Sequence, residues 1–265
     1  MAMDIKYVCP FWGCEGKSPE EFLTAVKTAG YEAFEINVPQ DPHFEKQLAP
    51  LAKELGLELI AQQWLETMVE SASQYAKRLD KRLHELAKFE PIFINSHTGR
   101  DYFSFDENCR IIDQVLAFEE ETGIPVYHET HRGRFNYSAP ATMAYLKPFP
   151  NLKFTADLSH WLLVSESNLD DQGEALEALT KNARYIHARI GDTQRSQVGN
   201  PFDPELKTLR ESYEQRWAKM VEQQKLKGAN RFYICPEFGP KPYLNSASWS
   251  LSTVMSLIVN LLSIM

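Results

Sequence analysis

Short apolar runs alternate along the whole chain with longer segments that have the composition of helices. Eight runs rich in β-branched and aromatic residues predict buried strands at residues 5–9, 33–37, 57–62, 91–95, 124–129, 153–157, 185–189 and 232–237. Helices are predicted between and after them, at residues 19–29, 44–55, 66–89, 106–122, 140–146, 169–182, 204–227 and 246–262. Ser18 and Pro19 form a helix start, and Gly56 and Gly123 follow helix ends.

This strict alternation predicts a single (β/α)8 TIM barrel that spans residues 1–265 as one domain. Barrels of this kind commonly use about 250 residues. No linker divides the chain, and no Gly-x-Gly-x-x-Gly turn follows the first strand, so a doubly wound sheet is disfavoured. The chain is 43% hydrophobic, which is enough to bury a large core.

Five of the predicted strands lead into a residue that can bind a metal ion or transfer a proton. The successive gaps between these residues are 32, 28, 30 and 50 positions, close to one strand-plus-helix unit except for the last. The carboxyl ends of all barrel strands lie on one rim, where catalytic groups collect. The sequence therefore predicts two imidazoles and three carboxylates around one mouth: His97, Glu129, Asp157, His187 and Glu237.

Simpler structural roles compete with this interpretation. Glu129 has Arg132 and Arg134 nearby in the chain for an ion pair, but an acid that ends a buried strand is costly to desolvate without a compensating cation. Asp157 is also a natural N-cap for the turn that follows it. His187 alone is as compatible with a core histidine as with a ligand. The joint occurrence of these residues at one barrel end favours a site.

The order of four short motifs resembles the xylose-isomerase-like TIM-barrel superfamily, which holds sugar isomerases, ketose epimerases and the endonuclease IV branch. The motifs are Glu129, Asp157-x-x-His160, His187 and Glu237. The resemblance in element order covers essentially the whole chain, although its specific support rests on these motifs. It implies that Glu129, Asp157, His187 and Glu237 bind one divalent metal ion. It also implies that Glu129 and Glu237 act as an acid–base pair.

Further residues are expected to contact the substrate. The resemblance implies this role for His160 and Arg189. Trp12, Phe11 and Trp64, near the ends of the first and third strands, are candidates to stack on a sugar ring, with packing at the rim as the alternative. Gln62, Gln63 and Glu35 are candidates to bind hydroxyl groups. The expected substrate-binding residues are His160, Arg189, His97, Trp12, His131 and Gln63.

One departure from the family pattern concerns the seventh strand. The family often has an acid three residues after its ligand histidine, whereas Asp192 lies five residues after His187 and three after Arg189. Either the loop is longer by two residues, or Arg189 occupies the ligand position and metal binding is compromised. We favour His187, because a guanidinium is not a workable ligand. Residues 191–201, within the long final gap, form either a mobile cover over the site or a surface loop.

Three carboxylates and one imidazole suit Mn²⁺, Mg²⁺, Co²⁺ or Zn²⁺. The expected function is a metal-dependent isomerase or epimerase of a sugar or sugar phosphate, in which one glutamate removes the proton α to a carbonyl and the other returns it. Two alternatives stay open: a lyase or dehydratase acting on a polyol or keto acid, and a non-catalytic sugar-binding barrel. An endonuclease is disfavoured, since it would need more histidines and a basic groove.

The net charge of −8 favours a small carbohydrate-like partner over nucleic acid or an anionic membrane surface. Homo-oligomerisation is left open. Four scattered cysteines and the absence of a visible secretory signal indicate a cytoplasmic protein. Residues 251–265 are apolar but too short to span a membrane, and a buried final helix is expected there.

Overall fold

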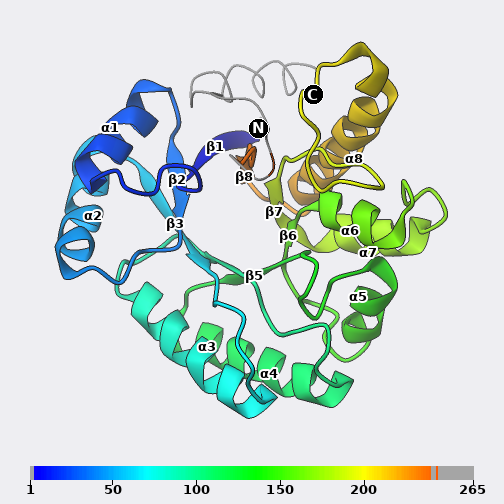
Figure 1. Cartoon of the computed structure of the whole chain (residues 1–265), viewed down its shortest axis with the longest axis horizontal. Helices are drawn as coiled ribbons and strands as arrows, with labels where there is room; N and C mark the ends of the chain where they lie inside the picture. The colour runs from blue at the N-terminus through cyan, green and yellow to red at the C-terminus, as the bar shows by residue number, and fades with distance from the viewer. Residues whose placement is uncertain (1–2, 240–242, 244–265) are drawn as a thin grey trace.

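Eight parallel strands close into a barrel in chain order, and helices surround it (Figure 1). The structure is a computed structural model that describes residues 3–239 and residue 243. The strands are β1 (Asp4–Pro10), β2 (Ala33–Ile36), β3 (Glu58–Gln63), β4 (Ile94–Ser96), β5 (Val126–Glu129), β6 (Phe154–Ala156), β7 (Ala183–His187) and β8 (Arg231–Cys235). β8 pairs with β1 and closes the barrel, which confirms the predicted (β/α)8 fold class.

The helices follow the strands in the predicted order. They are α1 (Pro19–Thr28), α2 (Pro42–Leu55), α3 (Ala72–Ala87), α4 (Phe105–Thr122), α5 (Ala139–Leu146), α6 (Leu158–Ser165), α7 (Gly173–Asn182) and α8 (Lys207–Leu226), with a 3₁₀ turn at Pro204–Leu206. Right-handed β-α-β connections run anticlockwise when the strands point toward the viewer. The strands of Figure 1 run in this sense, so the figure looks onto the end of the barrel where the strands finish.

Two helix predictions were wrong in detail. The helix expected from residue 66 begins at Ala72, because Ser71 caps it: the Ser71 hydroxyl accepts from the backbone of Gln74, and the Gln74 side chain accepts from the backbone of Ser71. α6 was not predicted at all, since Asp157 was expected to cap only a turn and instead caps a helix of eight residues. The helix expected at 246–262 and the apolar stretch at 251–265 lie outside the described residues.

Apolar side chains form three clusters around the barrel wall. One packs β1 to β5 against α1 to α4, and a second packs β6 to β8 against α5 to α8 and Ile112 of α4. The third fills the inside of the barrel and includes Phe93, Tyr185 and Tyr233. The Phe93 ring stacks on Tyr127, with ring centroids 4.4 Å apart. This cluster lies inside the barrel, below the polar side chains at the carboxyl ends of the strands.

The long segment between β7 and α8 is packed against the barrel end. Val198 is fully buried, and its backbone amide donates to the carbonyl of Ile190 at 2.9 Å. The Gln197 side chain is also buried and makes two hydrogen bonds to the backbone of Gly239, at 2.9 and 3.1 Å. The interpretation of residues 191–201 as a plain surface loop was therefore wrong at its centre, since this part is tied to the segment that carries Glu237.

Within residues 3–239 and 243, no helix is long and apolar enough to cross a membrane.

Candidate metal and substrate site

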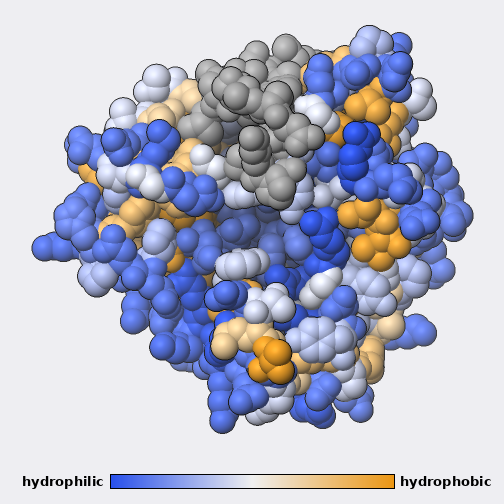
Figure 2. Space-filling view, viewed as in Figure 1, coloured by the Kyte–Doolittle hydropathy of each residue, from blue (hydrophilic) through white to orange (hydrophobic). Residues whose placement is uncertain are grey.

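The four expected metal ligands meet at the carboxyl end of the barrel. Glu129 ends β5, His187 ends β7, and Asp157 and Glu237 follow β6 and β8. One ligand atom from each lies within 4.8 Å of the other three, and all four residues are buried. Figure 2, drawn in the same orientation as Figure 1, shows a hollow with a hydrophilic surface near the centre of this end. The strand ends therefore bring these side chains to one place.

His187 is held in a defined orientation by a carboxylate from the opposite side of the barrel. Its Nε2 atom lies 3.1 Å from Oε2 of Glu35, which is buried on β2. Its Nδ1 atom faces Oε2 of Glu237 at 3.1 Å and Oε2 of Glu129 at 3.7 Å. A ligand histidine commonly donates its other ring nitrogen to a carboxylate, which fixes the ring and its tautomer. Glu35 fits this role, whereas the sequence suggested only hydroxyl binding for it.

The donor atoms fit a divalent ion. Nδ1 of His187 and Oε2 of Glu237 are buried and have no hydrogen-bond partner, although they lie 3.1 Å apart. Buried polar atoms are normally satisfied. A divalent ion bound between these atoms would satisfy both of them. Three carboxylates and one imidazole also match the oxygen-rich sites of divalent metals.

Arg189 lies beside this group rather than in it. It forms an ion pair with Oδ2 of Asp157, and its Nη2 atom lies 3.4 Å from Oε2 of Glu237 and 2.6 Å from Nε2 of His160. His187 belongs to the four-residue group, whereas the guanidinium of Arg189 is taken up by its ion pair with Asp157, so His187 remains the expected fourth ligand. The positive charge of Arg189 balances part of the local negative charge and weakens the attraction of the site for a cation.

Charges within the group shift one another's pKa values. Burial opposes protonation of His187, but the surrounding carboxylates outweigh burial and raise its pKa well above the usual value. Burial opposes ionisation of Glu237, but Arg189 and His187 outweigh it and lower the pKa of Glu237. Burial raises the pKa of Asp157 to about 6 even though Arg189 favours its ionised form. These opposing shifts in one small volume are typical of functional sites.

Asp157 has two roles in this structure. Its Oδ1 atom caps α6 by accepting from the backbone amide of Ser159 at 2.9 Å and from the Ser159 hydroxyl at 2.6 Å. Its other oxygen faces Arg189 and the ligand group. The N-cap role expected as the simple alternative is present together with the position in the site.

A row of three imidazoles borders the ligand group. His97 contacts Oε2 of Glu129 through Nε2 at 2.8 Å. The rings of His97 and His131 have centroids 4.5 Å apart, and those of His131 and His160 are 3.9 Å apart. Burial lowers the pKa of both His97 and His131 to about 3, so these rings are neutral near pH 7. Three expected substrate-binding residues thus adjoin the site.

Trp12 and Gln63 lie at the same end of the barrel. The guanidinium carbon of Arg189 lies 5.9 Å from the Trp12 ring centroid and equally far from that of Tyr243. Gln63 is buried at the end of β3, where its Oε1 atom accepts from the Ser96 hydroxyl at 2.7 Å and its Nε2 atom has no partner. Tyr243 was missed because no motif marks it.

The other two aromatic candidates lie in different surroundings. Phe11 is buried between α1 and α2, with its ring 4.8 Å from Phe22 and 5.8 Å from Phe44, so it packs the core. The side chain of Trp64 is 44% exposed, on the loop before α3. The expected alternative partners of Glu129 differ as well, because Glu129 contacts Asn95 and histidines rather than a neighbouring arginine.

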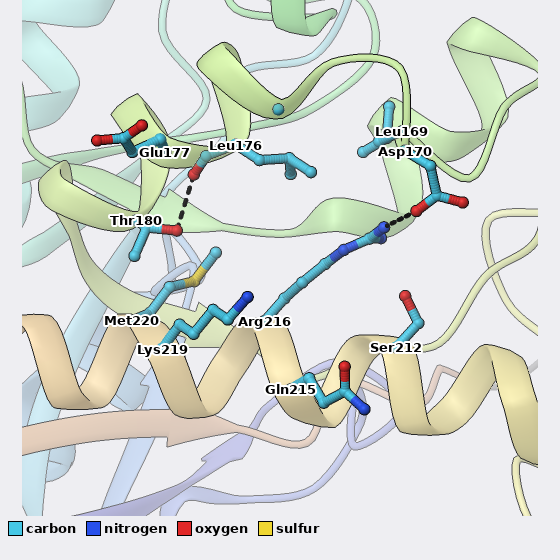
Figure 3. Close-up of a pocket in the computed structure, with 11 residues that line it drawn as sticks. Leu169, Asp170, Leu176, Glu177, Thr180, Ser212, Gln215, Arg216, Lys219 and Met220 are labelled. Carbon is cyan, nitrogen blue, oxygen red and sulfur yellow. Dashed lines mark hydrogen bonds and ion pairs between the residues drawn. The ribbon is translucent and has the colours of Figure 1, made fainter.

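A separate pocket of about 410 Å³ lies outside the barrel, between α7 and α8 (Figure 3). Arg216 crosses it from α8 and pairs with Asp170, and apolar side chains such as Leu176 and Met220 line the rest. It brings together no imidazole or group of acids that suits metal binding or proton transfer. The barrel mouth remains the candidate site.

No protein-family model matches the sequence, and no curated protein matches it. Solved structures do resemble the fold. A xylose isomerase domain-containing protein from Salmonella typhimurium superposes with a TM-score of 0.66 at 15% identity, over 100% of this chain and 98% of that one. The probable 3-DHS dehydratase AsbF of petrobactin synthesis, from Bacillus anthracis, gives 0.64 at 16% identity, over 96% and 99% of the two chains. SacUVDE gives 0.55 at 11% identity, over the full length of both.

These likenesses, together with the closed parallel barrel, show that the chain shares the (β/α)8 TIM-barrel fold of the xylose isomerase domain-containing protein and of AsbF.

Proposed function

We propose that this protein is a divalent-metal-dependent enzyme that transfers a proton next to the carbonyl group of a small polyhydroxylated substrate, as an isomerase or epimerase. The observation that carries the proposal is the buried group of Glu129, Asp157, His187 and Glu237, in which one ligand atom of each residue lies within 4.8 Å of the others. Glu129, Asp157, His187 and Glu237 are the residues that would hold the ion. When bound, a divalent ion supplies Lewis-acid stabilisation of the charge that develops on the carbonyl oxygen.

The chain's own groups divide the remaining work. Glu237 is ionised because Arg189 and His187 favour its charged form, and we assign it the removal of the α proton. Asn95 donates to the Oε2 atom of Glu129 at 2.8 Å. We assign Glu129 the return of the proton to the substrate. His97 and Arg189 flank these acids and are placed to contact substrate oxygens.

Proton exchange with solvent tests this proposal. Ketoses, aldoses and hydroxy-keto acids are incubated with the protein and Mn²⁺ in D₂O, and deuterium at the α carbon is followed by proton NMR. We expect exchange with at least one compound, and a rate at least about 100-fold lower for Glu237→Gln, the usual scale of general base catalysis. Glu177→Gln, on the outer face of α7 and far from the mouth, serves as the matched control and should keep the wild-type rate.

The products distinguish related activities. Loss of water instead of return of the proton would identify a dehydratase, the activity that the name of one structural neighbour carries. An absence of exchange with every compound would contradict the proposal and favour a binding protein. Elemental analysis of the same samples adds a second readout, because equal metal content in wild type and Glu237→Gln would remove Glu237 from the ligand set.

A further inference from the structure

One guanidinium at the barrel mouth is buried without an acidic partner. Arg134, in the loop after β5, is only 5% exposed. Its Nε and Nη1 atoms have no hydrogen-bond partner, and its Nη2 atom makes a long contact of 3.5 Å to Nδ1 of His97. No carboxylate of residues 3–239 forms an ion pair with it. A buried charge without compensation is strongly unfavourable, so the loop holds Arg134 in a position that an external anion would complete.

Two other buried arginines, Arg82 and Arg189, are compensated from within the chain. Arg189 pairs with Asp157. Arg82 donates to Oδ1 of Asn37 at 2.8 Å, and its Nη1 atom lies 3.5 Å from Glu85. The lack of compensation at Arg134 is therefore a property of the mouth and not of buried arginines in this fold.

Arg100 adds a second positive charge on the same side of the mouth. It is 3% exposed, its Nη2 atom donates to backbone carbonyls of the loop before α3 at 3.3 and 3.4 Å, and its Nε atom has no partner. Its guanidinium lies over the ring of Tyr75, 5.1 Å from the centroid. The Tyr75 hydroxyl donates to the backbone carbonyl of His97 at 2.9 Å, so the ring that Arg100 covers adjoins residue 97.

The His97 ring connects this positive region to the ligand group. Its Nδ1 atom faces Arg134, and its Nε2 atom contacts Oε2 of Glu129 at 2.8 Å. A ligand atom bound at Arg134 would thus lie one imidazole ring away from the metal ligands. That separation lets a small molecule place an anionic group at Arg134 while its carbonyl and hydroxyl oxygens lie at the metal centre.

We propose that Arg134, supported by Arg100, binds the carboxylate or phosphate group of the substrate. The inference deepens the proposed function and rests on it, because it assigns the substrate class to the same site. The substrate is then a hydroxy-keto acid or a phosphorylated sugar, and a neutral sugar lacks the group that Arg134 binds. A guanidinium offers planar paired donors that match both anions.

Three compounds with the same carbon chain test this assignment: gluconate, glucitol 6-phosphate and neutral glucitol. Binding to the full chain is measured by isothermal titration calorimetry with Mn²⁺ present. We expect gluconate or glucitol 6-phosphate to bind at least about tenfold more tightly than glucitol, the effect of hydrogen bonds to a charged group. The stronger of the two identifies the anion as carboxylate or phosphate.

The variants locate the effect. In Arg134→Met the advantage of the anionic compound should disappear while glucitol binding stays unchanged. Arg132→Met is the matched control: Arg132 lies in the same loop but donates to the Tyr243 hydroxyl at 3.1 Å, and its variant should keep the advantage. If circular dichroism shows that Arg134→Met does not fold, Arg134→Lys replaces it. This variant keeps the positive charge but loses the paired donors, so the preference for the anionic compound over glucitol should decrease.

The inference is overturned if wild type binds anionic and neutral compounds equally, if it binds none of them, or if the advantage survives in every foldable Arg134 variant. Metal content of the same samples separates this outcome from failure of the proposed function. Suppose wild type binds no Mn²⁺ but prefers the anionic compound, and Arg134→Met loses this preference. The anion site is then supported although the proposed metal chemistry fails. Protein that binds Mn²⁺ without any anion preference shows the reverse.

Discussion

Two layers of side chains fill the barrel, and they lie only two residues apart on the same strands. The lower layer is aromatic, whereas the upper layer, toward the carboxyl ends, consists of polar and ionisable groups. Successive inward-facing residues of a strand are two positions apart. The pairs are Phe93 and Asn95 at β4, Tyr127 and Glu129 on β5, and Tyr185 and His187 on β7.

The difference between the layers separates stability from function. In the lower layer, Phe93 contacts Tyr127, Tyr185 and Tyr233 with ring centroids 4.4 to 5.4 Å apart, so apolar surface is buried in good packing. In the upper layer, polar atoms stay without partners, as at His187 Nδ1. Buried polar groups without partners cost stability and persist where a function requires them. The lower layer therefore stabilises the strands that hold the upper layer in place.

Phe93→Ala should have the largest effect on stability and none on the ligand group. Removal of a buried phenylalanine from a packed core costs about 3–5 kcal/mol of the free energy of unfolding. Urea denaturation measures this loss, and Mn²⁺ affinity of the folded variant should equal that of wild type. Val69→Ala, at a fully exposed position, is the control with an expected change under about 0.5 kcal/mol. A large fall in Mn²⁺ affinity in Phe93→Ala would show that the layers are not independent.

Glu35→Gln tests the reverse case in the upper layer. Loss of the carboxylate that orients a ligand histidine typically lowers metal affinity about 10- to 100-fold. Glu32→Gln, just before the same strand and paired with Lys6, is the matched control and should bind metal like wild type. Equal metal affinities of Glu35→Gln and wild type would show that Glu35 does not position His187 for metal binding.

His128→Gln should have the smallest effect and concerns a polar group in the barrel wall. His128 lies between the inward-facing Tyr127 and Glu129, and its Nδ1 atom contacts the Thr98 hydroxyl at 2.7 Å. Burial lowers its pKa to about 3, below its unfolded value. The unfolded chain therefore binds an extra proton below about pH 6.5, and stability is lost as pH falls from there toward 3 at about 1.4 kcal/mol per pH unit.

The pH dependence of metal-free wild type and His128→Gln gives the measurement. The free energy of unfolding is determined by urea denaturation at pH 7.5 and pH 5. The difference between the two pH values should be about 2 kcal/mol smaller in the variant, since one titrating group is gone. Wild type and variant with the same pH dependence would show that His128 is protonated to the same extent in the folded and unfolded chains.

The sequence was most informative where the interactions are local. The alternation of apolar runs and helix caps such as Ser18 depend on neighbouring residues, and they predicted the barrel and the strand ends at which Glu129 and His187 lie. The role of Glu35 depends on His187, which is 152 residues away in the chain, so no spacing could indicate it. Arg134 was considered only as an ion-pair partner for Glu129, because burial without a partner is visible only once the fold is known.

The paired hydrogen bonds between Gln197 and Gly239 have a consequence for protein engineering. They join the long segment after β7 to the segment that carries Glu237. Gly239 also has no room for a side chain, since a Cβ atom there would lie 2.0 Å from the Trp12 ring. A design that replaces the long segment to alter selectivity therefore has to exchange residues 12, 197 and 239 together.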